Sequence, residues 1–85
     1  KKSKKYMEPF LVEFKRKKVE KLSYFSHDGE EFIYLLEGVL EFRTENQQYV
    51  LYPGDSLYFE SSIPHAYRAL ERKNAKALTV VYPTR

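Results

Sequence analysis

The chain has 85 residues, with 15 Lys and Arg against 12 Asp and Glu, 8 Tyr and 6 Phe, and no cysteine. This length leaves room for one small core, and the lack of cysteine excludes disulfides, cysteine-ligated zinc and thiol catalysis. Any metal site must therefore use histidine and carboxylate ligands. The uncharged run at residues 77–83 is far shorter than the ~20 residues of a membrane helix, and no secretory signal is visible. We therefore expect a cytoplasmic protein without a membrane partner.

Positive charge is concentrated at the start of the chain. Residues 1–21 hold nine basic and three acidic residues, whereas the remaining 64 carry a net charge of −3. Clustered Lys and Arg can bind phosphate, but residues 1–5 have no aromatic side chain on which a base could stack. We interpret residues 1–5 as a basic linker, residues 15–18 as a loop and residues 6–85 as a single domain. Nucleic-acid binding is expected only through a domain absent from this chain.

Short runs rich in Val, Ile, Leu, Phe and Tyr recur from residue 6 onward, separated by Gly, Pro, Asn, Asp and Ser. This spacing is typical of sandwiches and barrels, and no segment has a helical stripe. The sequence therefore predicts an all-β fold, a small antiparallel β-barrel or jelly roll. The expected strands are residues 7–14, 22–26, 32–36, 39–44, 48–52, 57–59, 65–70 and 77–82.

The clearest predicted turn is Glu37-Gly38. Gly38 can take the positive φ of a tight turn, so we expect residues 32–36 and 39–43 to form a hairpin. Residues 53–55 and 61–64 mark two further reversals.

Two ionisable residues fall on a face that is otherwise apolar. Side chains two apart on a strand share a face, so Phe25, His27, Glu31, Ile33 and Leu35 have one parity if the bend at residue 29 keeps the phase. A carboxylate on that face is costly to bury unless it is hydrogen-bonded, protonated or bound to a cation.

A second histidine, His65, begins a later strand and can point inward with Tyr67. Two histidines and one carboxylate suit a divalent metal such as iron, manganese, nickel or zinc, with coordination positions left open. The alternative needs no metal: His27 is then a turn residue, and tyrosine hydroxyls or Arg68 hold Glu31.

Two segments resemble the motifs of the cupin superfamily. The first motif is Gly-x5-His-x-His-x3or4-Glu-x6-Gly, and His27, Glu31 and Gly38 match its second histidine, glutamate and last glycine. The second motif is Gly-x5-Pro-x-Gly-x2-His-x3-Asn, and Gly54 and His65 match its first glycine and its histidine. The resemblance covers roughly residues 7–83 and implies an antiparallel barrel with a pocket inside.

The chain departs from these motifs at several positions. Phe25 stands in place of the first histidine, Glu60 and Ser62 replace Pro and Gly, and Ala69 replaces the last Asn. Three of the four usual ligand positions remain, and Phe25 is expected to narrow the pocket. The predicted metal ligands are His27, Glu31 and His65, and the predicted ligand-binding residues are Phe25, Tyr58 and Tyr67.

Residues 7–12, 29–34 and 54–59 are most similar to the C-terminal cupin domain of bacterial helix-turn-helix (XRE-type) transcriptional regulators. This resemblance implies a domain that senses a small molecule in the barrel and dimerises. The alternative is a small metal-dependent cupin enzyme, an isomerase, dioxygenase or decarboxylase. A third hypothesis is a barrel that serves only dimerisation and stability. Small size and exposed strand edges predict a homodimer.

Overall fold

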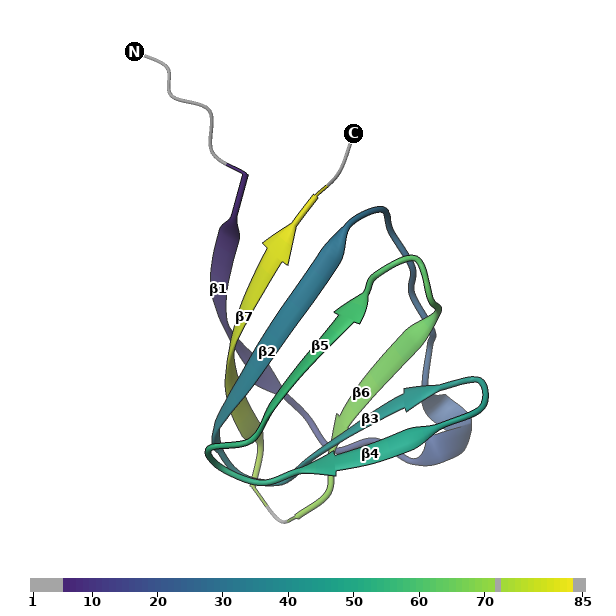
Figure 1. The fold of residues 1–85 in the computed structure, drawn as a ribbon. Helices are drawn as coiled ribbons and strands as arrows, with labels where there is room; N and C mark the ends of the chain where they lie inside the picture. The colour runs from purple at the N-terminus through teal and green to yellow at the C-terminus, as the bar shows by residue number, and fades with distance from the viewer. Residues whose placement is uncertain (1–5, 72, 84–85) are drawn as a thin grey trace.

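This computed structural model describes residues 6–71 and 73–83. Within these residues the chain forms seven strands and one turn of 3-10 helix, joined by loops. The predicted linker at residues 1–5 lies outside the described residues. The strands surround one interior, as Figure 1 shows. They are β1 (Glu8–Phe14), β2 (Glu30–Glu37), β3 (Leu40–Thr44), β4 (Gln48–Leu51), β5 (Ser56–Glu60), β6 (His65–Ala69) and β7 (Ala75–Tyr82).

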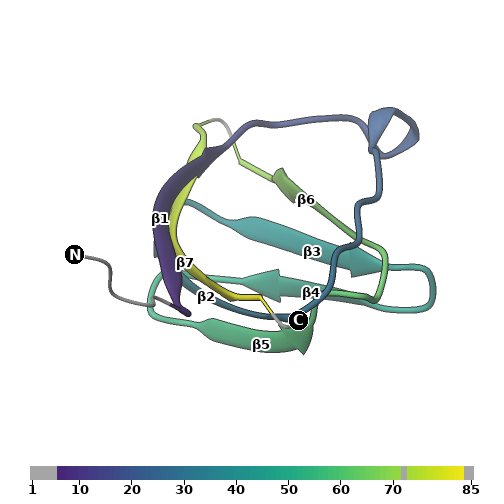
Figure 2. The same ribbon diagram turned by 90° about the horizontal axis from the view of Figure 1, so that it is seen from above.

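The strands form two sheets that face each other (Figure 2). One sheet has the order β1-β7-β2-β5 and the other the order β4-β3-β6, with every neighbouring pair antiparallel. The chain passes from one sheet to the other after β2, β4, β5 and β6. These crossings define a jelly-roll barrel and confirm the predicted all-β, antiparallel fold.

The predicted hairpin across Glu37-Gly38 is wrong. Both edges of β2 are already paired, one with β7 and the other with β5, so β3 joins the opposite sheet. Gly38 does take a positive φ of 84°, and a Cβ there would lie 2.9 Å from the Cα of Ala75. The turn therefore moves the chain between sheets at a point where only glycine fits.

The strand predicted at residues 22–26 is also absent. The segment between β1 and β2 instead contains a 3-10 turn, Val19–Lys21, and two isolated bridges to β6, Arg16 with Ala69 and Phe25 with His65. It therefore meets β6 at the two ends of that strand, and residues 22–26 contribute only the bridge at Phe25. No helix in the part of the chain that the structure describes is long and apolar enough to cross a membrane.

The core lies between the two sheets. β2 alternates, so that Ile33 and Leu35 are fully buried and share their face with Glu31. Burying each of these aliphatic side chains contributes about 1.5–3 kcal/mol to stability. The predicted inward parity of residues 31, 33 and 35 is confirmed. The buried cluster consists of Ile33, Leu35, Leu40, Leu51, Ala69, Ala75 and Ala77, with Phe14, Leu57 and Tyr67 packed against it.

Candidate metal centre

The structure brings His27, Glu31 and His65 together at the end of the barrel where β2 and β6 begin. Glu31 is the second residue of β2 and points inward, with 7% of its surface exposed. His65 is the first residue of β6 and is 4% exposed. His27 lies in the segment before β2, and its side chain is 43% exposed. Two elements of the barrel and the segment that leads into it therefore meet at this point.

One carboxylate oxygen lies between the two imidazoles. The Oε1 atom of Glu31 is 3.5 Å from Nε2 of His27 and 3.7 Å from Nε2 of His65. One donor atom from each of the three residues lies within 4.8 Å of the other two. Ligand atoms held about 2.1 Å from one ion, at octahedral to tetrahedral angles, are roughly 3.0–3.4 Å apart. The two carboxylate–imidazole distances therefore exceed the spacing around a single divalent ion by only a few tenths of an ångström.

Backbone carbonyls orient both histidines. The Nδ1 atom of His65 lies 2.7 Å from the carbonyl oxygen of Ile63, and Nδ1 of His27 lies 3.3 Å from that of Asp28. A carbonyl can only accept a hydrogen bond, so each Nδ1 carries the proton and donates it. In the neutral imidazole, which is the form that binds metal, Nε2 then keeps a free lone pair on the side of Glu31. Metal-binding histidines have the same arrangement, with the second ring nitrogen donating to an acceptor.

Tyr67 holds the other oxygen of the same carboxylate. Its hydroxyl donates to Oε2 of Glu31 at 3.0 Å. Burial, reinforced by the nearby charge of Glu31, raises the pKa of Tyr67 far above its ordinary value. Tyr67 therefore stays a neutral donor, which leaves Oε1 to face the histidines. Of the two partners that the metal-free alternative names for Glu31, the structure shows the tyrosine hydroxyl. Arg68, the other, donates to Glu41 instead.

Two phenylalanines form an apolar wall beside His65. The ring of Phe59 lies 4.8 Å from the imidazole and 4.6 Å from the ring of Phe42. The sequence reasoning did not single out either residue. Phe59 lies two residues after Leu57, so both side chains point inward, and Phe59 is opposite Glu31 where β2 pairs with β5. The alternation of inward and outward side chains along the predicted strand at residues 57–59 could therefore have identified Phe59.

Phe25 lies at the outer edge of the candidate metal centre, beside His65. It exchanges two backbone hydrogen bonds of 2.9 Å with His65, and directly opposed residues of an antiparallel pair turn their side chains to the same face. Its side chain is nevertheless 66% exposed. The structure therefore does not place Phe25 in the barrel interior, where the sequence predicts that it narrows the pocket.

Tyr58 faces the opposite way. It lies on the outer side of β5, opposite Phe32, and its hydroxyl donates to Glu30. That hydrogen bond raises the pKa of the Tyr58 hydroxyl. The expectation that Tyr58 faces the barrel interior with the predicted metal ligands is wrong, because Leu57 and Phe59 occupy the inward positions of β5. Tyr58 lines a depression of about 190 Å³ on the outer face, to which Glu31 also contributes.

Solved structures with a similar fold include metal-loaded proteins. An Fe(II) form of HppE in complex with substrate has a TM-score of 0.81 and 28% identity, over 91% of this chain and 46% of that chain. A Co(II) form of HppE in complex with substrate has a TM-score of 0.80 and 26% identity, over 91% and 45%. Hydroxypropylphosphonic acid epoxidase from S. wedmorenis in complex with fosfomycin has a TM-score of 0.80 and 25% identity, over 91% and 44%.

The chain thus spans less than half of the length of these solved proteins. No curated protein sequence is significantly similar to it. The cupin domain family matches residues 10–81, which include all three converging residues and nearly the whole jelly roll. The chain therefore belongs to the cupin domain family.

Proposed function

We propose that this domain is a metal-dependent cupin enzyme domain in which His27, Glu31 and His65 hold one divalent ion. The observation that carries the proposal is the convergence of two Nε2 atoms on one oxygen of a buried carboxylate. The remaining polar atoms of the group are bound elsewhere: both Nδ1 atoms to carbonyls and Oε2 to Tyr67. The likeness to Fe(II) and Co(II) forms of HppE adds support.

A set of two histidines and one carboxylate is typical of non-haem Fe(II) oxygenases. The ion would supply a Lewis acid and a redox centre with open coordination positions. The chain itself would fix the ligand geometry through Tyr67 and would exclude water on one side through Phe42 and Phe59. The exposed side of His27 would leave a path for a small substrate.

The likeness to hydroxypropylphosphonic acid epoxidase favours oxidation over the isomerase and decarboxylase chemistries that cupins also include. We therefore propose Fe(II)-dependent oxidation of a small organic acid. Phe25 at the rim would contact the apolar part of that substrate.

Anaerobic titration tests the proposal. Protein treated with EDTA and dialysed is titrated with Co(II), and d–d absorption bands report coordination. We expect saturation at one ion per chain. The Fe(II) form is then exposed to oxygen, with and without a panel of small hydroxy acids and phosphonates, in an oxygen electrode. Substrate-stimulated oxygen consumption is the expected result, whereas the lack of saturable Co(II) binding would contradict the metal site itself.

Removal of one hydroxyl probes the positioning role of Tyr67. We expect Tyr67→Phe to lower Co(II) affinity by about tenfold, since partners that orient metal ligands typically contribute 10–100-fold. The barrel should stay folded because the ring still packs against Phe14. Tyr58→Phe is the matched control, because its hydroxyl lies on the outer face. Equal affinities in the two variants would show that Tyr67 does not position Glu31.

The regulatory hypothesis stays a prediction. It places the helix-turn-helix in a domain outside this chain. The predicted small-molecule sensing and the cytoplasmic location likewise stay predictions.

We also propose that two copies pair through the outer face of the four-stranded sheet. The middle of this face has apolar cross-strand neighbours: Leu11 lies opposite Leu78, which lies opposite Tyr34. Soluble monomers rarely expose large contiguous patches of this kind. The exposed apolar side chains of the patch are Met7, Leu11, Phe32, Tyr34, Tyr58, Leu78 and Tyr82.

A charge in the centre of the patch tests the proposed dimer. Phe32 lies between Val80 and Tyr58, so we expect Phe32→Glu to convert a micromolar dimer into a monomer in sedimentation velocity. Val50→Glu introduces the same charge at an exposed position of the other sheet and should leave the dimer intact. A monomeric wild-type chain across micromolar concentrations would refute the proposed pairing.

A further inference from the structure

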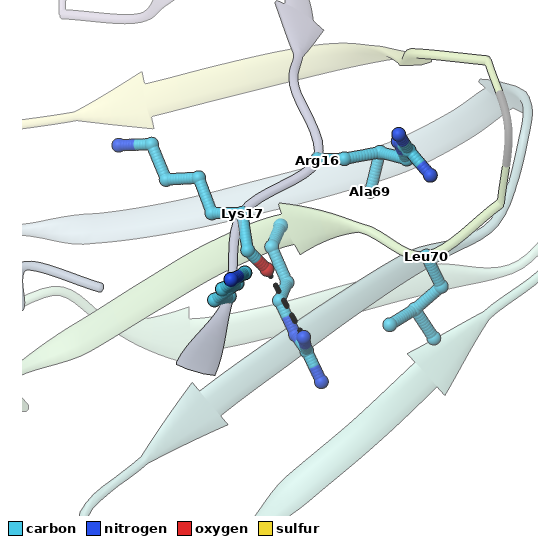
Figure 3. Close-up of a pocket in the computed structure, with 6 residues that line it drawn as sticks. Arg16, Lys17, Ala69 and Leu70 are labelled. Carbon is cyan, nitrogen blue, oxygen red and sulfur yellow. Dashed lines mark hydrogen bonds between the residues drawn. The ribbon is translucent and has the colours of Figure 1, made fainter. Parts of the chain in front are cut away.

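A second group of functional side chains lies where the chain leaves β1 and crosses the end of β6. Here a pocket of about 350 Å³ opens on the surface (Figure 3). It lies at the other end of β6 from His65, about 14 Å along the strand at ~3.4 Å per residue. The pocket is therefore separate from the candidate metal centre. It is lined by Arg16, Lys17, Lys18, Arg68, Ala69 and Leu70.

The basic segment is fastened to the barrel. The backbone N–H of Ala69 donates to the carbonyl of Lys15 at 3.0 Å, and Arg16 and Ala69 form a parallel bridge. The guanidinium of Arg68 donates through Nη1 to the carbonyl of Lys17 at 3.0 Å. Residues 15–18 are therefore a loop, as the sequence predicts, but one whose backbone is held in place over β6.

A buried acid fixes the arginine at the base of the pocket. Arg68 donates through Nε to Oε1 of Glu41 at 2.6 Å, and Glu41 is 6% exposed. Arg43 donates to the other oxygen of the same carboxylate at 3.2 Å. One carboxylate thus serves two guanidinium groups, which leaves this trio with a net charge of +1. Arg68 is oriented before any ligand arrives.

The remaining cations of the pocket are not paired with any acid that the structure describes. Among residues 6–71 and 73–83, Arg16, Lys17 and Lys18 take part in no ion pair. An adjoining depression of about 590 Å³ adds Lys73 and one acid, Glu71. Figure 3 shows the side chains of Arg16 and Lys17 leaving the segment in opposite directions. A concave site lined by one sign of charge concentrates ions of the other sign.

We propose that this pocket binds a small molecule that carries a phosphate or polyphosphate group. Guanidinium groups match phosphate oxygens as paired donors, and lysines add mobile positive charge. The volume is at the lower end of the range for small-molecule sites, and Ala69 and Leu70 provide an apolar side. None of the described residues that line the pocket is aromatic, so a small phosphorylated ligand fits better than stacked nucleic-acid bases.

Inorganic pyrophosphate is the probe for this proposal. Binding is measured with the full chain in the presence of EDTA, and again with the His65→Ala variant. EDTA and His65→Ala remove any contribution from metal at the other site, so this test is independent of the proposed function. We expect a Kd below about 1 mM by calorimetry. Amide NMR shifts should be confined to Arg16, Lys17, Ala69 and Leu70.

The double variant Arg16→Gln, Lys17→Gln should weaken pyrophosphate binding by about tenfold or more, since each charged hydrogen bond contributes strongly. Lys76→Gln on β7 removes one charge outside the pocket and should have no effect. No binding at 10 mM (about −3 kcal/mol) would overturn the proposal. Equal losses in both variants, or tighter binding of single-stranded oligonucleotides than of pyrophosphate, would also overturn it.

Discussion

Replacing Glu31 by alanine is expected to abolish divalent-metal binding while leaving the barrel folded. Glu31 contacts both histidines, and its removal leaves two imidazoles without the carboxylate that joins them. We expect Co(II) affinity to fall by more than about 100-fold, beyond the effect of losing an orienting partner. Elemental analysis of protein purified without chelator, together with Co(II) titration, measures the loss.

The neighbouring residue supplies the matched control. Glu30→Ala removes the same charge from the same strand, but Glu30 points to the outer face and accepts from Tyr58. Its metal content should equal that of the wild type. Circular dichroism and thermal melting confirm that both variants fold. If Glu31→Ala retains stoichiometric metal, the carboxylate is not a ligand and the assignment of the centre fails.

Replacing Gly29 by alanine is expected to be the most destabilising small substitution in the domain. Gly29 has a φ of +118°, and a Cβ there would lie 2.5 Å from the carbonyl oxygen of Tyr82 and 2.9 Å from the Cα of Pro83. Backbone strain and a backbone clash act together, so we expect a loss of more than about 3 kcal/mol. In a domain of this size the Tm should fall by more than about 12 °C.

Gly54→Ala separates the two causes. Gly54 also has a positive φ, +95°, but nothing lies within 4 Å of a Cβ placed there. Only the strain remains, and we expect a loss of about 1–2 kcal/mol in denaturant unfolding. If Gly29→Ala is at least as stable as Gly54→Ala, the backbone at the end of β7 must shift to make room for the added methyl group, and the predicted clash does not exist. Gly29 lies between His27 and Glu31, so its variant should also bind metal more weakly.

The convergence of His27, Glu31 and His65 could be predicted only through the cupin resemblance, whose two motifs match these three positions. Strand alternation by itself places Glu31 on the face of Ile33, but it does not bring His65 beside Glu31, since His65 begins a strand of the other sheet. The orientation of each imidazole could not be predicted, since Nδ1 of His65 is held by a carbonyl two residues earlier, in a turn. Turn geometry of this kind is not encoded in residue type alone.

Strand pairing was less accessible from the sequence. Glu37-Gly38 has the composition of a hairpin turn, yet β2 pairs with β5 and β7, whose residues lie far along the chain. A turn signal reports that the chain reverses but not which sheet it enters. The outward direction of Tyr58 follows from the same long-range register, because its neighbour Phe59 is opposite Glu31. Local composition also favours a strand at residues 22–26, but an adjacent partner is missing beyond one bridge.

The order β1-β7-β2-β5 has a consequence for synthesis on the ribosome. The last strand to emerge, β7, lies between β1 and β2, so neither of these strands has its full set of partners until β7 leaves the exit tunnel. Pairings of such high sequence separation form slowly. Glu31 lies opposite Val81, near the end of β7. The carboxylate is therefore expected to reach its final position only when translation of the domain is complete, and ion capture should follow translation rather than guide it.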